Sequence, residues 1–359
     1  MTIWGDIALD GARRTVTVER EFAASAPELW DALTRPSRLA DWIGAYEETA
    51  DGFRLSMGGL DVDALVAGRV IACEPERRIL VGWRFSGDGR TEAGTEVEAT
   101  LEPAGDDRAR LTLRHAHVQA VTAAVYGAGW EDVLTNLAGA VGEETSLIGE
   151  HAYLGKAADP ARSDAALEEY RRVEAALVQA RMLRAGNRSA VHLERLLDAP
   201  REVVWDALTL PDRIGRWLWP VVAWPDDPAR ERRLLPGDTF TLGDENVQGG
   251  AHEMEVLELE DGRLFAFTWG PDRSSVRIRL ADDAAGTLLT LDQEAIPDVF
   301  GGGRMRSAPD FAAGWHSLVD GLTLLLAGLS VPEPGGLWDA AYAVYVETEA
   351  ARPDGISAR

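Results

Sequence analysis

Hydrophobic and polar residues alternate with a period of two in two distant segments, TVTVEREF (15–22) and AVHLERLL (190–197). This alternation is typical of a strand with one buried face. After the first segment, Leu29 and Leu33 stand four residues apart, which is helical spacing, and the second segment is followed by the same pattern. We therefore expect a strand and then a short helix at both places.

The residues around these helices predict where they begin and end. Ser25 and Asp198 precede the two helical patterns and have side chains that can cap a helix N-terminus. Pro36 and Pro211 follow the patterns, and proline cannot continue a helix. We expect the prolines to end the two helices.

Further alternating runs follow in the first half of the chain, separated by Gly, Pro and Asp clusters. The predicted strands are 53–57, 65–73, 79–85, 96–102 and 111–116. A long helix is predicted over 128–148, and its counterpart over 311–329. Neighbouring strands joined by short turns pair antiparallel. This order predicts an α+β fold, in which a curved antiparallel sheet wraps around one long C-terminal helix.

The sequence contains an internal repeat. Residues 15–42 align without a gap with 190–217, and twelve positions are identical, against roughly two expected by chance. Further along, VIACEPERRILVGW (70–83) matches VLELEDGRLFAFTW (256–269) in the placement of its Val, Glu, Arg and Trp residues. The chain is thus predicted to hold two copies of one fold.

A chain of 359 residues is also too long for one ordinary core. We expect one domain over 1–185, including a C-terminal connecting helix, and a second over 186–359. Within 159–187, Leu167 and Tyr170 belong to a helical apolar pattern, and Gly186 is suited to end the helix. The connection is therefore predicted to be a helix packed on the first copy.

The segments ASAPELWDALTRPSRLADWIG (24–44) and APREVVWDALTLPDRIGRWLWP (199–220), each followed by a late Gly-Trp pair, resemble the Aha-type homologues of the heat-shock-protein ATPase activator. That family is part of the START-like (SRPBCC) superfamily, which includes polyketide cyclases, lipid-transfer domains and enediyne self-resistance proteins. The resemblance implies two helix-grip domains, each enclosing an apolar cavity. It implies little about function, because the shared residues are of structural types.

Composition narrows the range of partners. The formal net charge of −24 and the isoelectric point near 4.6 argue against nucleic acid and anionic membrane surfaces. The longest apolar run, LTLLLAGL (322–329), is too short to span a bilayer. We expect a cytoplasmic protein without membrane insertion. A single cysteine, Cys73, rules out an internal disulfide.

Aromatic residues alternate onto one face of one predicted strand in each copy, and we expect them to line a cavity together with residues of the long helix. The alternative is a solid core filled by the same residues. The candidate ligand-binding residues are Val81, Trp83, Phe85, His115, Trp130 and Leu134 in the first copy, and Phe267, Trp269, Gln293 and Trp315 in the second.

Histidines offer the clearest polar candidates. His115 and His117 lie two apart on a predicted strand and should share one face, which is half of a metal site. Because no further His or Cys follows at ligand spacing, we expect no metal. The sequence shows no catalytic constellation and no cofactor-binding loop, so we expect no cofactor and name no catalytic residues. Glu131 and His316, which follow the helix tryptophans, are interpreted as solvated helix-surface residues.

The sequence favours non-enzymatic binding of a hydrophobic small molecule, such as a lipid, polyketide or antibiotic, for sequestration or self-resistance. The alternatives are an enzyme resembling polyketide aromatase/cyclases, with His115, Arg84 and Tyr126 as candidates, and a module that contacts a chaperone. A homodimer is also compatible with the sequence. We expect the first copy to be the better ligand site, because the second has bulkier aromatics and Gln293 in place of His115.

Overall fold

The computed structural model describes residues 4–57, 65–87, 90–105, 107–143, 160–185, 188–225, 233–243, 250–270, 273–297, 299–301, 304–306, 308–331 and 338–350. The chain divides into two compact units, Met1–Glu174 and Ala175–Arg359, called here the first and second domain. The sequence placed the boundary later, after residue 185. Among the described helices, none has both the length and the apolar character needed to cross a bilayer.

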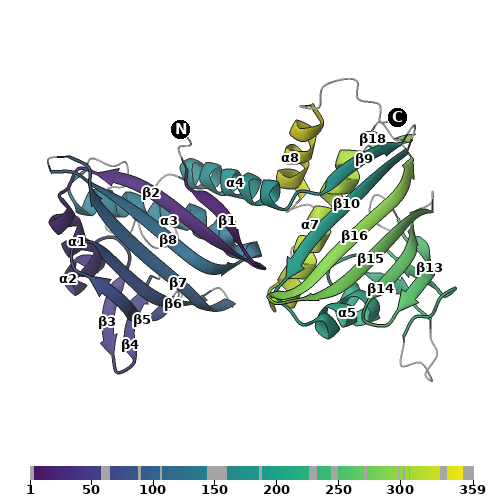
Figure 1. Ribbon diagram of the computed structural model, residues 1–359, viewed down its shortest axis with the longest axis horizontal. Helices are drawn as coiled ribbons and strands as arrows, with labels where there is room; N and C mark the ends of the chain where they lie inside the picture. Colours follow the sequence, from purple (N-terminus) through teal and green to yellow (C-terminus); the bar gives the residue numbers. More distant parts are fainter. Residues whose placement is uncertain are drawn as a thin grey trace. The chain divides into compact units, whose positions relative to one another are not determined.

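The first domain contains an eight-stranded antiparallel sheet with the strand order β1-β2-β8-β7-β6-β5-β4-β3 (Figure 1). The strands are β1 (Asp6–Asp10), β2 (Arg13–Phe22), β3 (Ala45–Thr49), β4 (Gly52–Ser56), β5 (Leu65–Glu74), β6 (Arg78–Gly87), β7 (Arg90–Pro103) and β8 (Ala109–Gln119). Six of them correspond to the strands expected from the alternating pattern, although β4 ends at Ser56, one residue before the predicted end. The short strands β1 and β3 were not expected.

The helices of the first domain are α1 (Ala26–Thr34), α2 (Pro36–Leu39), α3 (Ala120–Ala140) and α4 (Pro160–Leu177). Ser25 caps α1 as predicted, because its hydroxyl accepts a hydrogen bond from the Glu28 N–H at 3.4 Å. Pro36 does not simply end a helix. It is the first residue of α2, a position where the missing proline N–H leaves no bond unmade. The long helix α3 contacts β1, β2 and β8.

The second domain repeats this architecture with the strand order β11-β12-β13-β14-β15-β16-β10-β9 (Figure 1). Its sheet comprises β9 (Arg181–Ala185), β10 (Arg188–Leu197), β11 (Val221–Ala223), β12 (Thr239–Leu242), β13 (His252–Glu260), β14 (Leu264–Trp269), β15 (Ser274–Asp283) and β16 (Gly286–Pro297), and β17 (Val299–Gly301) pairs with β18 (Arg304–Arg306). The predicted α+β fold, with two antiparallel sheets and a long helix for each, is confirmed.

The helices of the second domain are α5 (Arg201–Thr209), α6 (Pro211–Ile214), α7 (Ala308–Leu326) and α8 (Trp338–Ala350). One prediction about α5 was wrong. Its N-cap residue is Pro200, which makes no side-chain cap, so Asp198 does not cap it. The helix ends at Thr209, before Pro211 as predicted, and Pro211 also begins α6 in the same way that Pro36 begins α2.

The predicted connecting helix exists as α4, but it ends at Leu177. The chain then forms β9, which pairs with β10 in the second sheet, so these residues form a strand and not the end of a helix. The predicted stop at Gly186 lies outside the described residues.

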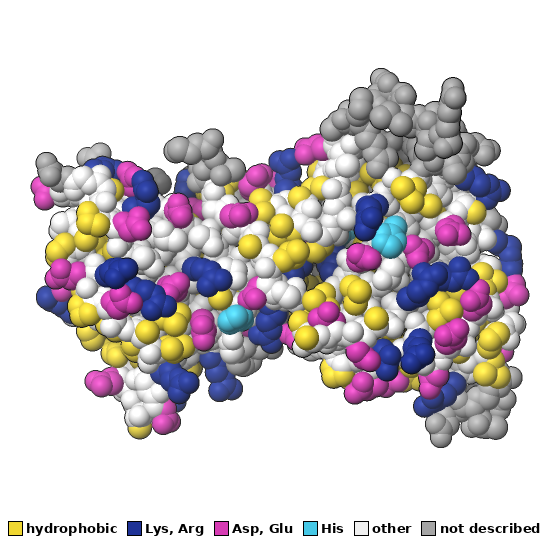
Figure 2. Space-filling model, viewed as in Figure 1, with side chains coloured by type: hydrophobic (Ala, Val, Ile, Leu, Met, Phe, Trp, Pro, Cys, Tyr) yellow, Lys and Arg dark blue, Asp and Glu magenta, His cyan; other side chains and the backbone are white. Residues whose placement is uncertain are grey.

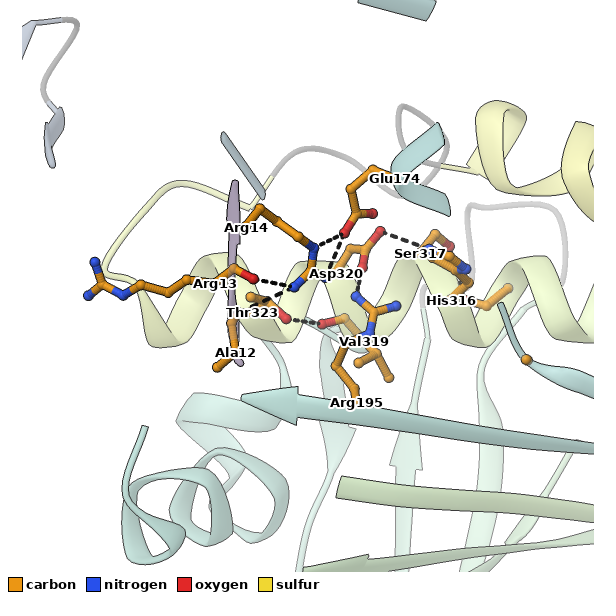
Figure 3. A network of polar contacts seen from close by, with 12 residues as sticks. Ala12, Arg13, Arg14, Glu174, Arg195, His316, Ser317, Val319, Asp320 and Thr323 are labelled. Carbon is orange, nitrogen blue, oxygen red and sulfur yellow. Dashed lines mark hydrogen bonds and ion pairs between the residues drawn. The ribbon is translucent and has the colours of Figure 1, made fainter. Parts of the chain in front are cut away.

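Helix α4 is held to the first domain by polar contacts. The Tyr170 hydroxyl donates a hydrogen bond to Glu131 of α3 at 3.0 Å and accepts one from the Gly5 N–H at 2.9 Å. Arg14 of β2 forms an ion pair with Glu174 at 2.7 Å (Figure 3). Glu131 is 5 % exposed, so its predicted position on the solvated surface of the helix was wrong. Burial raises the pKa of the Glu131 carboxyl, which the hydrogen bond with Tyr170 only partly offsets.

The second domain makes the same arrangement with its own last helix. The Tyr345 hydroxyl of α8 lies 3.0 Å from the Nδ1 atom of His316 and accepts a hydrogen bond from the Ala180 N–H at 2.7 Å. His316 is 1 % exposed, so its predicted solvated position was also wrong. Tyr170 and Tyr345 hence fix equivalent helices to equivalent tryptophan-bearing helices.

Candidate ligand site between the sheet and the long helix

His115 lies at the centre of a buried polar chain in the first domain. Its Nδ1 atom lies 3.1 Å from the indole nitrogen of Trp130 on α3, and its Nε2 atom lies 3.0 Å from the Thr95 hydroxyl oxygen on β7. The Thr95 hydroxyl donates to the main-chain oxygen of Trp83 on β6 at 2.8 Å. The chain therefore runs from the long helix through β8 and β7 to β6.

These contacts fix the protonation of His115. An indole nitrogen can only donate, so Nδ1 must be the acceptor and Nε2 carries the hydrogen. The Thr95 hydroxyl donates its hydrogen bond to the main-chain oxygen of Trp83, so it must accept the one from His115 Nε2. His115 is fully buried, and burial lowers its pKa to about 3. The His115 ring is neutral near pH 7, and each of its nitrogens already makes one hydrogen bond.

The second domain contains the same chain with glutamine in place of histidine. The Trp315 indole of α7 donates to the Gln293 carbonyl oxygen on β16 at 2.7 Å. The Gln293 amide donates to the Ser274 hydroxyl on β15 at 2.9 Å, and Ser274 donates to the Trp269 main-chain oxygen at 3.3 Å. We expected the two sites to differ in polarity because of this replacement. Instead, Gln293 makes the same two bonds as His115.

A second polar contact also recurs between the first strand of each repeat and its long helix. Arg195 of β10 donates to Asp320 of α7 at 2.5 Å (Figure 3). In the first domain Arg20 of β2 donates to Thr135 of α3 at 3.0 Å. The two contacts involve equivalent positions, so the long helix has the same attachment to the sheet in both copies.

His117 does not lie on the same face of the strand as His115. The two histidines therefore do not form the pair of metal ligands that the sequence suggested. A β-bulge interrupts the pairing of β8 with β2, and His117 has a φ of 62°. A bulge adds one residue and breaks the alternation of side chains. His117 consequently points outward and forms a 2.7 Å contact with Asp10.

The inner face of β6 is partly open to solvent. Trp83 is buried, and its ring centroid lies 5.4 Å from that of Trp130. Ile79, Val81 and Phe85, which alternate with Trp83 on the same face, are only half-buried. This face therefore retains accessible apolar surface in the first domain.

The equivalent strand of the second domain is closed. Every residue of β14 is buried, including Phe265, Phe267 and Trp269. Phe240 of β12 packs on this strand, with its ring centroid 5.8 Å from that of Phe267. Trp269 and Trp315 have ring centroids 4.6 Å apart. The inner face of the second sheet is thus filled by its own aromatic side chains.

The neighbouring strands show the same contrast. Val70 of β5 lies directly opposite Val81, on the same face, and is 54 % exposed. Its counterpart Val256 lies opposite Phe267 and is 1 % exposed. The open region of the first domain consequently extends over two adjacent strands.

The long helices provide the opposite side of each site. Leu134 of α3 is fully buried, as are Trp130 and, in the second domain, Trp315. The structure thus brings Trp83, His115 and Trp130 together. Arg84, named from the sequence as a catalytic candidate, alternates to the outer face of β6 and is exposed, so it lies outside this group.

Glu92 of β7 was not recognised from the sequence. It is buried, and its carboxylate accepts hydrogen bonds from the Gln119 N–H at 2.6 Å and the Thr122 hydroxyl at 2.9 Å. Burial raises the pKa of the Glu92 carboxyl, against the hydrogen bonds that favour its charged form, including one from Tyr126. The Tyr126 ring in turn lies 4.4 Å from His115. Nothing in the sequence indicated that Glu92 accepts these hydrogen bonds, because its partners at the start of α3 are distant in the chain.

The surface around these domains carries mixed charge. Figure 2 shows acidic and basic side chains interspersed on the visible face, without a continuous block of one sign. A nucleic-acid site would require a concentrated basic surface. The visible face has no such feature among the described residues.

Three of the solved structures that are similar to this chain are CalU16, DynU16 and MLL2253. CalU16 from Micromonospora echinospora is 22 % identical, with a TM-score of 0.34, over 47 % of this chain and 95 % of that one. DynU16, a protein in the dynemicin biosynthetic locus, is 19 % identical, with a TM-score of 0.32, over 87 % and 96 %. MLL2253 from Mesorhizobium loti is 28 % identical, with a TM-score of 0.31, over 38 % and 96 %.

A search of the curated proteins found no match. The family described as "Activator of Hsp90 ATPase homolog 1-like protein" matches twice, over residues 23–142 and 198–327. These two segments make up more than half of the chain and fall one in each domain. The chain therefore belongs to this family, as a tandem pair of START-like domains.

Proposed function

We propose that the first domain binds a hydrophobic small molecule against the inner face of its sheet, and that the second domain is a filled copy without an equivalent site. The observation that carries this proposal is the half-buried state of Ile79, Val81 and Phe85, where the matching strand β14 is buried throughout. Apolar surface left open between a sheet and a helix is stabilised when an apolar ligand covers it.

The aromatic difference between the copies accounts for this contrast. Ile79 and Val81 occupy the positions of Phe265 and Phe267. Two smaller side chains leave volume that the second domain fills with rings. A ligand of one or a few rings would restore the packing that the first domain lacks.

The test is to fill the first site with the residues of the second. The full chain carrying Ile79→Phe and Val81→Phe should lose binding of the apolar dye Nile red, followed by its fluorescence. Leu80→Phe adds a ring on the outer face of the same strand and serves as the matched control, with binding unchanged. Equal binding by the wild type and the doubly substituted chain would refute the proposal.

A second candidate function is a cyclase-like enzyme in the same site. The specific observation in its favour is Glu92, a buried carboxyl with a raised pKa that interacts with Tyr126. A buried carboxyl with a raised pKa is a candidate general acid or base. His115 is less suited to this role because both its ring nitrogens are occupied.

The enzyme proposal has its own test. A ligand released from protein purified from its host would be returned to the wild type and to Glu92→Gln, and the products compared by mass spectrometry. Conversion by the wild type alone would support an enzyme. Unchanged ligand with both proteins would favour simple binding. The chaperone contact and the homodimer stay predictions.

A further inference from the structure

Trp83 holds a buried hydrogen-bond donor that the protein itself does not use. Its side chain is 6 % exposed, and no acceptor contacts its Nε1 atom among the residues that the structure describes. A buried donor without a partner costs about 1–3 kcal/mol. A phenylalanine would avoid this cost while keeping an aromatic ring at the same position.

Four other buried indoles in the chain have partners. Trp42 and Trp217 donate to the main-chain oxygens of Ala32 and Ala207 at 3.0 and 2.9 Å. Trp130 donates to His115, and Trp315 of the second domain donates to Gln293. The Trp83 indole differs from these four, because its buried donor has no acceptor among the described residues.

The groups around Trp83 cannot supply the acceptor. His115 lies with its ring centroid 6.0 Å away, but its Nδ1 atom accepts from Trp130 and its Nε2 atom carries a hydrogen. The Thr95 hydroxyl accepts a hydrogen bond from His115 Nε2 and donates one to the main-chain oxygen of Trp83. The nearby polar atoms are already hydrogen-bonded to each other, so the Trp83 donor remains available to a bound molecule.

The surroundings also indicate what kind of acceptor fits. The neighbouring rings of Trp130 and His115 offer aromatic surface, which favours a flat, apolar molecule. His115 is neutral near pH 7, so it supplies no positive charge to balance an anion. A neutral oxygen, such as a ketone or quinone carbonyl, meets these conditions without the desolvation cost of a charge.

We propose that the first domain selects neutral, flat, apolar molecules bearing a carbonyl oxygen, and that the Trp83 Nε1–H donates to this oxygen. This inference rests on the proposed function, because it concerns the same open face of β6. It adds a specificity-determining residue and a ligand class. The second domain is not expected to share the preference, since the inner face of β14 is filled.

A matched pair of probes tests the proposal. Fluorenone and fluorene have the same three-ring frame, but only fluorenone has a carbonyl oxygen. Equilibrium dialysis of the full chain against each probe should show a preference of about tenfold for fluorenone, the size of one hydrogen bond. Trp83→Phe should abolish this preference and change fluorene binding less than twofold. Trp269→Phe, the matched control in the second domain, should leave the preference intact.

The outcomes separate the two proposals. Binding of both probes with equal affinity, or a preference that survives Trp83→Phe, would overturn the role of Trp83 while leaving the hydrophobic site in place. Binding of neither probe, or fluorene binding that Ile79→Phe with Val81→Phe does not reduce, would overturn both.

A second measurement covers the case in which Trp83→Phe does not fold. The indole N–H resonance of Trp83 in the wild-type chain, followed by nitrogen-edited NMR, should move downfield with fluorenone and not with fluorene. A resonance that responds alike to both probes would overturn the proposal without any substitution.

Discussion

Replacing His115 with glutamine should remove an acid sensitivity from the first domain while leaving its stability near pH 7 almost unchanged. Gln293 already makes the equivalent bonds to Trp315 and Ser274, so glutamine can occupy this position. We expect His115→Gln to alter the free energy of unfolding by less than about 1 kcal/mol at pH 7, since its size and bonding pattern are preserved.

The magnitude at lower pH follows from the pKa of His115. It is about 3 in the folded domain, against 6.5 in the unfolded chain. Between these values the unfolded chain binds a proton that the folded domain does not, so stability falls as pH falls. The free energy of unfolding therefore has its full value above about pH 6.5, and at pH 5 it is about 2 kcal/mol lower because of His115. His115→Gln should not show this loss.

Hydrogen exchange of β8 amides in the full chain, corrected for the intrinsic effect of pH, measures this difference. The wild type should lose about 2 kcal/mol more protection than His115→Gln between pH 7 and pH 5. The reciprocal Gln293→His should introduce the same sensitivity in β16. Identical pH dependence in the wild type and His115→Gln, or a His115 NMR titration near 6.5, would refute the reasoning.

Four further substitutions test the packing. Gly127→Ala should destabilise the first domain by about 1–3 kcal/mol in urea unfolding, because an added Cβ would lie 2.5 Å from the Tyr170 ring; unchanged stability would contradict this close approach. Trp42→Ala and Trp217→Ala should each cost about 3–5 kcal/mol, seen as lower melting temperatures. Altered ligand affinity with unchanged melting would oppose a packing role. Trp130→Phe should cost about 1–3 kcal/mol by leaving His115 Nδ1 without its donor, and an unaffected urea midpoint would argue against that bond.

The fold could be predicted because its signals are local and occur twice. Alternation along β2 and β10 and the repeated tryptophan-containing helices indicated the order of elements before any contact was known. The second role of Pro36, as the first residue of α2, was not predicted, because a proline that ends one helix and one that begins the next look alike in sequence.

The site was harder to predict, since it depends on contacts between distant segments. Trp83, His115 and Trp130 were predicted to line one cavity, and the structure places their rings side by side. Nothing local in the sequence indicates that Thr95 completes their hydrogen bonds. The bulge at His117 reversed the expected direction of its side chain. Glu92 became apparent only when the start of α3 was placed beside it.

The polar chain from Trp130 to Trp83 also has a direction. Each member donates onward toward β6, and the first member, an indole nitrogen, has no lone pair with which to accept. The chain therefore cannot reverse, and it cannot conduct a proton between helix and sheet. Its bond dipoles point the same way and strengthen one another. Because these bonds join α3 to three strands, we expect α3 to stay anchored here and a molecule to enter by movement elsewhere along the sheet.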